Sequence, residues 1–264
     1  MTIKAVIFCG GRGTRIRDVA DDIPKPLLSV GDRPILWHIM KTYSHYGIND
    51  FVLCLGYKGW LIKEFFLNYR YFTSDLTLSL DNKTPIQVHS EPTEANWRIT
   101  LAETGIDTQT GGRLWRVRPY LEDSPLFCVT YGDGVADINM DDLLAFHRSH
   151  GCIGTVTGVH PQGRFGVLSI DPSADVPMVS AFNEKPQSLE GFINGGFFVF
   201  DHRLWDYLSA DPSLIFEQQP LTALAAAGQL AVYEHNGFWQ PMDTYREWSL
   251  LNDLWERGAA PWKR

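Results

Sequence analysis

The stretch Ile3-Lys4-Ala5-Val6-Ile7-Phe8-Cys9-Gly10-Gly11-Arg12-Gly13-Thr14-Arg15 decides the fold. Its apolar first half is typical of a strand buried in a parallel sheet. The glycines that follow predict a turn at the carboxyl end of that strand, because glycine lets the backbone approach a phosphate group and expose its N–H groups to it. We therefore expect a buried strand that leads directly into an anion site.

Strand and helix patterns alternate after this turn. Apolar residues in 35–47 recur at helical spacing, with Pro34 before them and Gly47 at the end. Residues 51–56 form a second apolar run, and residues 61–69 follow as a second amphipathic helix. This β-α-β-α order predicts an α/β protein with a Rossmann-like mixed, mostly parallel sheet and helices on both faces.

The rest of the chain extends this pattern, with one exception. A helix is expected at 110–121 and a buried strand at 126–131, whereas 75–110 predicts an irregular, hairpin-like excursion with a polar loop at 81–96. Because no linker or repeat interrupts the sequence, we expect residues 1–264 to form a single domain with insertions. The remaining predicted elements are a helix at 141–150 and strands at 153–159, 165–170, 178–182, 197–200 and 230–233.

Composition excludes several classes of protein. The 264 residues carry 23 basic and 31 acidic side chains, a net charge of −8, which argues against nucleic acid as a partner. The four cysteines form no CxxC pair, so we expect buried free thiols in a reducing compartment. No secretory signal and no run of about 18 apolar residues is visible, which predicts a cytoplasmic protein without a membrane partner.

The glycine-rich turn fits neither of two common phosphate motifs. A dinucleotide fingerprint that begins at Gly11 needs glycine where the chain has Ile16, and the Gly-Lys-Ser/Thr of a P-loop is absent. Arg15, together with Lys25 in Pro24-Lys25-Pro26, would still supply positive charge for a triphosphate. The alternative is a plain tight turn with solvated basic side chains.

Two aspartates are candidate metal ligands. Asp133 follows the strand at 126–131, where open α/β sheets bind ligands, and Asp243 precedes the last helix. One or two carboxylates with phosphate oxygens and water are the usual ligands of Mg²⁺. The alternatives are a turn residue for Asp133 and a helix cap for Asp243. A metal role requires the two to meet in space.

Two further segments are candidates for contacts with a sugar phosphate. In Asn183-Glu184-Lys185-Pro186 the lysine could bind a phosphate, and Glu184 and Asn194 could bind hydroxyl groups. A solvated turn is the alternative at each of these positions.

Together these stretches resemble the sugar-nucleotidyltransferase family, and within it the members that transfer a cytidylyl group. The glycine-rich segment with Thr14-Arg15 and the later Pro24-Lys25-Pro26 match the opening signature of the family. The chain departs from it in having Phe8-Cys9 where the family usually has Leu-Ala, and in the segment 81–96. The other supporting stretches are 34–41, 43–51, 56–59, Thr110-Gly111-Gly112-Arg113, Tyr131-Gly132-Asp133-Gly134-Val135, 194–199 and Met242-Asp243-Thr244.

The resemblance implies the nucleotide-diphospho-sugar transferase type of α/β fold and a Mg²⁺-dependent reaction. A sugar 1-phosphate, by the resemblance glucose 1-phosphate, attacks the α-phosphorus of CTP in line and releases pyrophosphate, giving CDP-glucose. The nucleophile is already an anion, so catalysis rests on positioning and on neutralisation of charge. The resemblance also implies a homo-oligomer, expected to be a hexamer.

Roles for individual residues follow from the same resemblance. Arg15, Lys25 and Asp133 are the expected catalytic residues, and Asp133 and Asp243 the expected Mg²⁺ ligands. Glu184, Lys185 and Asn194 are expected to bind the sugar phosphate. The expected nucleotide-binding residues are Phe8, Cys9, Gly10, Gly11, Arg12, Gly13, Thr14, Arg15, Lys25, Thr108, Arg113 and Gly132.

Three alternatives remain open on the sequence. The same chemistry could serve another phosphorylated acceptor, which the departure at 81–96 suggests. The nucleotide could be dTTP or UTP instead of CTP. A catalytically silent binding subunit is the third alternative; against it, Arg15, Lys25, Asp133 and Asp243 are all present.

Overall fold

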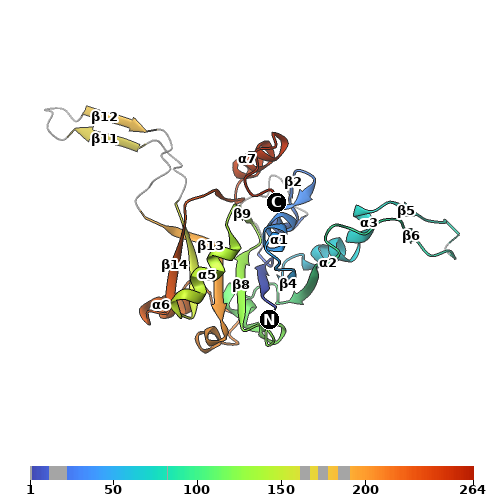
Figure 1. Cartoon of the computed structure of the whole chain (residues 1–264), viewed down its shortest axis with the longest axis horizontal. Helices are drawn as coiled ribbons and strands as arrows, with labels where there is room; N and C mark the ends of the chain where they lie inside the picture. Colours follow the sequence, from blue (N-terminus) through green and yellow to red (C-terminus); the bar gives the residue numbers. More distant parts are fainter. Residues whose placement is uncertain (1, 12–22, 82, 161–166, 172–177, 184–190) are drawn as a thin grey trace.

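The computed structural model describes residues 2–11, 23–81, 83–160, 167–171, 178–183 and 191–264 (Figure 1). Its centre is a seven-stranded sheet in the order β14-β10-β13-β8-β1-β4-β7. Every strand runs parallel to the others except β13, which is antiparallel to both of its neighbours. This confirms the predicted mixed, mostly parallel sheet. The strands are β1 (Lys4–Phe8), β4 (Asp50–Leu55), β7 (Arg98–Glu103), β8 (Leu126–Tyr131), β10 (Gly154–Val159), β13 (Ile193–Asp201) and β14 (Leu230–His235).

Both faces of the sheet are covered, as the alternation of side chains along β1 illustrates. Ala5 and Ile7 point into one apolar core, and Val6 and Phe8 point into the other. The first core is closed by the helices α1 (Ile35–His45), α2 (Gly59–Leu67), α5 (Met140–His150) and α7 (Tyr245–Glu256). The second is closed by α4 (Thr110–Val117), α6 (Gln219–Ala226) and the 3-10 helix η4 (His202–Tyr207).

Local sequence signals define the ends of the helices. Helix α1 follows Pro34, and the chain turns at Gly47, whose φ of 78° suits glycine. Helix α5 begins where the Asn139 side chain accepts hydrogen bonds from two backbone N–H groups, and it ends at Gly151 with a φ of 70°. The helices predicted at 35–47 and 141–150 are thus present.

The segment 75–110 differs in one respect from the expectation. Strands β5 (Leu76–Thr77) and β6 (Gln87–Val88) form a short hairpin that projects from the body beyond α3 (Tyr69–Thr73) (Figure 1). The apolar residues at 99–101 do not belong to this excursion: they lie in β7, which pairs in parallel with β4 as the last strand of the main sheet. The single domain expected for residues 1–264 stays a prediction.

Smaller pairs complete the structure, and one of them shapes the site. Strand β9 (Gly134–Ala136) pairs antiparallel with β15 (Trp239–Pro241), which places the residue before β9, Asp133, beside the chain that follows β15. The other pairs are β2 (Ser29–Val30) with β3 (Arg33–Pro34) and β11 (Val167–Asp171) with β12 (Met178–Asn183), and the short 3-10 helices are η2 (Lys25–Leu27) and η3 (Arg118–Tyr120).

All four cysteines are free thiols, as the sequence predicts. Cys9, Cys54 and Cys128 are buried, but the prediction of burial is wrong for Cys152, which is partly exposed. Burial raises the pKa of the Cys54 and Cys128 thiols to about 12, so they remain protonated and unreactive. Among the residues that the structure describes, no helix has the length and apolar character needed to cross a membrane.

Candidate active site

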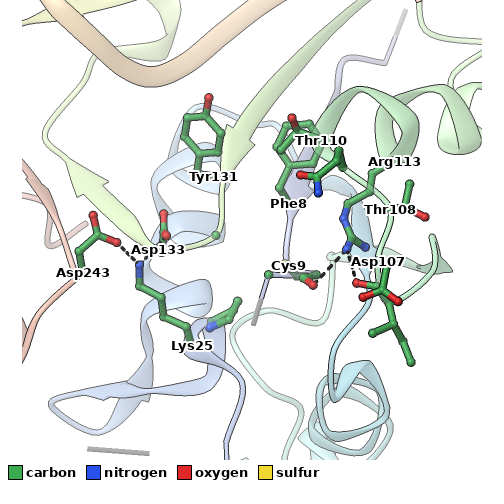
Figure 2. Close-up of a pocket in the computed structure, with 16 residues that line it drawn as sticks. Phe8, Cys9, Lys25, Asp107, Thr108, Thr110, Arg113, Tyr131, Asp133 and Asp243 are labelled. Carbon is green, nitrogen blue, oxygen red and sulfur yellow. Dashed lines mark hydrogen bonds and ion pairs between the residues drawn. The ribbon is translucent and has the colours of Figure 1, made fainter. Parts of the chain in front are cut away.

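The carboxyl ends of two neighbouring strands form the floor of a cavity of about 520 Å³. Strands β1 and β8 pair in parallel with Phe8 opposite Tyr131, so the turn after β1 and the turn after β8 emerge at the same edge of the sheet. The backbone N–H of Gly132 donates to the Phe8 carbonyl (3.0 Å), which ties the two turns together. The cavity is lined by Phe8, Cys9, Gly10, Gly11, Lys25, Pro26, Ile106, Asp107, Thr108, Gln109, Thr110, Arg113, Tyr131, Gly132, Asp133 and Asp243 (Figure 2).

One side of the cavity holds a lysine between two aspartates (Figure 2). The Nζ of Lys25 lies 2.6 Å from Oδ2 of Asp133 and 2.5 Å from Oδ1 of Asp243. The lysine side chain is 10% exposed, whereas the aspartates are 37% and 32% exposed. The two carboxylates therefore converge on one cation and still face the open cavity. A shared metal role requires Asp133 and Asp243 to lie close together, and the structure satisfies this condition.

The ion pairs also determine the charge of Lys25. Burial by itself lowers the pKa of this ammonium group, but the adjacent Asp133 and Asp243 carboxylates outweigh burial and raise the pKa above its ordinary value. Lys25 is therefore a permanent cation at any physiological pH. It is available to bind phosphate oxygens when they enter the cavity.

Local structure explains why Asp243 reaches this position. The backbone N–H of Met242 donates to the Asp133 carbonyl (2.8 Å), which continues the β9–β15 pairing up to the two aspartates. Helix α7 is capped by Thr244, whose side chain and Glu247 form a capping box. The residue that caps helix α7 is thus Thr244 and not Asp243, the alternative considered in the sequence. The Asp243 carboxylate is free of that role and pairs with Lys25 instead.

The opposite wall of the cavity is fixed by Arg113. Its guanidinium donates to the carbonyls of Leu55 (3.0 Å), Gly10 (3.1 Å) and Ile106 (3.2 Å) and to Oγ1 of Thr104 (2.7 Å). Because these partners come from three segments, the turn after β1, the end of β4 and the loop after β7, Arg113 holds the glycine-rich turn against the wall at 104–113. A Cβ added at Gly10 would collide with this guanidinium, which is why glycine is required there.

A hydrogen-bonded glutamate beside the cavity, Glu217, was not predicted from the sequence. Glu217 accepts one hydrogen bond from the Tyr131 hydroxyl (2.7 Å) and another from Oγ1 of Thr110 (2.6 Å). Nδ2 of Asn194 in turn donates to the Tyr131 hydroxyl (3.3 Å). Asn194 is therefore linked to the cavity through Tyr131, and it also lines a second, largely apolar cavity of about 390 Å³. A lone glutamate before a helix gives no sequence signal that would identify Glu217.

The predicted site residues divide into two groups. Those in the described part of the chain converge on the cavity, directly or, for Asn194, through Tyr131; their binding roles stay predictions. The rest, Arg12, Gly13, Thr14, Arg15, Glu184 and Lys185, lie outside the described residues.

The donor set fits a hard divalent cation. Asp133 and Asp243 provide carboxylate oxygens that already surround a positive charge, which is the ligand chemistry that Mg²⁺ prefers. Within the described residues no group of three or more His, Cys, Asp or Glu side chains could hold a metal by itself. A cation at the two aspartates would therefore complete its coordination with phosphate and water oxygens.

Fold and cavity together define an α/β protein with a glycine turn at the end of the first strand and, beside it, a pair of acids with a buried lysine. The family model described as "Nucleotidyl transferase" matches residues 4–244, and the chain belongs to this family.

Curated relatives and solved structures agree with this family. The chain is 47% identical to a probable glucose-1-phosphate cytidylyltransferase of Bacillus subtilis over 262 residues, 99% of each chain. It is also 47% identical to a glucose-1-phosphate cytidylyltransferase of Salmonella typhi over 261 residues, again 99% of each. A putative glucose-1-phosphate thymidylyltransferase from Bacillus anthracis shares the fold, with a TM-score of 0.69 at 16% identity over 96% of this chain and 95% of that one.

Proposed function

We propose that this chain transfers the cytidylyl group of CTP to glucose 1-phosphate, which gives CDP-glucose and pyrophosphate. The observation that carries the proposal is the Lys25–Asp133–Asp243 cluster, at the edge of a glycine-lined cavity in a member of the nucleotidyl transferase family. The choice of cytidylyl transfer and of glucose 1-phosphate rests on the two relatives at 47% identity over the full chain.

The cavity suits a reaction between two anions. The attacking phosphate oxygen needs no base, because it is already deprotonated at neutral pH. The residues must instead hold two negatively charged substrates together while charge builds up on the departing pyrophosphate. The glycine turn at Gly10 and Gly11 lets the backbone approach phosphates closely. We assign binding of the phosphates at the reacting centre to the ammonium group of Lys25.

Asp133 and Asp243 would hold the Mg²⁺ ion. When bound, the ion would supply additional positive charge for the phosphate oxygens. In the structure Lys25 pairs with Oδ2 of Asp133 and Oδ1 of Asp243, so the other oxygen of each carboxylate is the one that would hold the ion while the ammonium group stays beside it.

The compartment and the assembly are part of the same proposal. The four free thiols support a reducing compartment, for which we propose the cytoplasm. We also propose that the chain is a homo-oligomer, with a hexamer as the expected size. Exposed apolar side chains at the end of α2, in α3 and in the β5–β6 hairpin support self-association: Leu67, Phe72, Leu78 and Leu80 are 75%, 67%, 55% and 89% exposed. Light scattering after gel filtration measures the assembly directly.

A rate comparison tests the function. The protein is incubated with Mg²⁺, one of CTP, UTP, dTTP, GTP or ATP, and one of a panel of sugar 1-phosphates, and pyrophosphate release is followed. The proposal expects the highest kcat/KM for CTP with glucose 1-phosphate. A higher value for another triphosphate or another acceptor replaces the substrate assignment. If no pair of triphosphate and sugar 1-phosphate releases pyrophosphate, the result favours a catalytically silent binding subunit.

A further inference from the structure

The Glu217 carboxylate joins two residues that line the active-site cavity, Thr110 and Tyr131, and it lines the second cavity together with Asn194. Glu217 follows the buried Phe216 and precedes helix α6. The segment to which it belongs backs the wall at 106–113, because the N–H of Gln109 donates to Pro212 (2.8 Å) and that of Gly111 to Leu214 (2.9 Å). On its other side Glu217 faces the end of β8 at Tyr131.

Donors and acceptors around this carboxylate have fixed directions. An ionised carboxylate only accepts, so the hydroxyls of Thr110 and Tyr131 both donate their protons to Glu217. The Thr110 oxygen accepts from the backbone N–H of Phe216 (2.9 Å), a group that can only donate. Neither the Thr110 nor the Tyr131 hydroxyl can therefore reverse without breaking its hydrogen bond to Glu217.

The same logic orients Asn194. Its Oδ1 accepts from the backbone N–H of Gly196 (2.8 Å), which directs the amide nitrogen toward the Tyr131 hydroxyl. The Tyr131 oxygen can accept this bond because its own proton goes to Glu217. The described residues use one of the two hydrogens on Nδ2. The other is available for an oxygen acceptor, such as a sugar hydroxyl.

We propose that Glu217 is a positioning residue that sets the relation between the nucleotide wall, through Thr110, and the sugar-binding side, through Tyr131 and Asn194. The inference rests on the function proposed above and on the prediction from the sequence that Asn194 binds a sugar hydroxyl. Glutamine is the informative replacement. It has the same shape, but Tyr131 and Thr110 donate to different carboxylate oxygens, Oε1 and Oε2. In glutamine one of these positions is an NH₂ group, which can only donate and forces the hydroxyl that meets it to reverse.

Steady-state kinetics of Glu217→Gln, Tyr131→Phe and Thr110→Val test the proposal. Tyr131→Phe should raise KM for glucose 1-phosphate and Thr110→Val should raise KM for CTP, each by about tenfold, the value of one good hydrogen bond. Glu217→Gln should raise both KM values while kcat stays within about threefold. The exposed neighbour variant Gln218→Ala, whose side chain makes no capping hydrogen bond, is the matched control.

Double variants separate positioning from an independent contact. If Glu217 acts on the sugar through Tyr131, Glu217→Gln with Tyr131→Phe should raise the glucose 1-phosphate KM no further than Tyr131→Phe alone. Multiplicative effects in the double variant, or unchanged KM values in Glu217→Gln, overturn the proposal. If Glu217→Gln does not fold, Thr110→Val and Tyr131→Phe with Glu217 in place show whether the two hydroxyls serve different substrates. Equal effects of both variants on the same KM overturn the proposal.

The activity of the wild-type protein distinguishes a failure of the proposed function from a failure of the role proposed for Glu217. If the wild-type protein does not use CTP with glucose 1-phosphate, the proposed function fails, and the substrate pair it does use becomes the assay for Glu217. If it uses no pair, calorimetric dissociation constants for CTP and for glucose 1-phosphate replace the KM values. Equal affinities of the wild-type protein and Glu217→Gln for both compounds then overturn the positioning role.

Discussion

Replacing Lys25 by methionine removes the charge at the centre of the acid pair and keeps the length of the side chain. In the wild-type protein the ammonium group is 10% exposed and lies 2.6 Å and 2.5 Å from two carboxylate oxygens. A cation that neutralises charge in the transition state is typically worth about 100-fold in kcat, which corresponds to about 2.7 kcal/mol. We therefore expect kcat of Lys25→Met to fall by at least ~100-fold.

The effect on stability should be much smaller. Asp133 and Asp243 are 37% and 32% exposed, so water solvates them once the ammonium group is gone. We expect a loss of about 1 kcal/mol in the free energy of unfolding, the range of solvent-accessible ion pairs. Because the pKa of Lys25 is raised, its contribution is present in full below the unfolded value of about 10.4 and is lost only as the pH rises through the higher folded value.

Two measurements assess this variant. Pyrophosphate release gives kcat, and melting curves with and without MgCl₂ give stability. Without the lysine the two carboxylates lack a cation, so Mg²⁺ should raise the melting temperature of Lys25→Met more than that of the wild-type protein. Lys63→Met, which removes a surface ion pair with Glu103, is the control and should leave kcat unchanged. Near-wild-type turnover of Lys25→Met would refute the reasoning.

Three further predictions concern other parts of the molecule. Asp243→Asn should lower kcat at least ~100-fold with a melting temperature close to that of the exposed control Asp253→Asn; unfolding at room temperature would instead indicate a structural role. Gly10→Ala should cost about 1–3 kcal/mol in chemical denaturation, because its Cβ meets Arg113, whereas Gly11→Ala, which meets nothing within 4 Å, should cost far less; equal costs would contradict this packing. Burial lowers the pKa of His147 to about 4, so between about pH 6.5 and pH 4 the unfolded chain binds more protons than the folded one, and the free energy of unfolding decreases as the pH is lowered. From pH 7.5 to pH 5, His147 should account for a loss of about 2 kcal/mol in this free energy, a loss that is absent in His147→Gln. An equal pH dependence in the variant would rule out His147 as the cause.

Much of the fold could be predicted because the decisive signals are local. The apolar run before Gly10 and the helical spacing up to Gly47 depend on neighbouring residues alone, and the structure has a strand and a helix there. The place of β7 could not be predicted in this way. Its residues are typical of a short strand, but only the parallel pairing with β4, across the 42 intervening residues 56–97, brings it into the main sheet.

The candidate site shows the same division. Asp133 and Asp243 could each be identified from their position relative to a strand or helix, and Lys25 from the Pro24-Lys25-Pro26 segment after the glycine turn. The approach of the two aspartates depends on the β9–β15 pair, which no sequence pattern indicated. Arg113 was expected beside the nucleotide, and the structure adds that its guanidinium anchors the glycine turn. Glu217 was missed, because its partners Thr110 and Tyr131 lie 107 and 86 residues away along the chain.

The fate of the α-phosphorus of CTP tests the central claim most directly. CTP labelled at that phosphorus is incubated with glucose 1-phosphate, Mg²⁺ and the protein, and the products are separated and identified by mass spectrometry. Our account predicts that the label enters CDP-glucose, with one pyrophosphate released for each molecule formed and no label in CMP. Label that remains in CTP, or that appears in CMP without a nucleotide sugar, would contradict it.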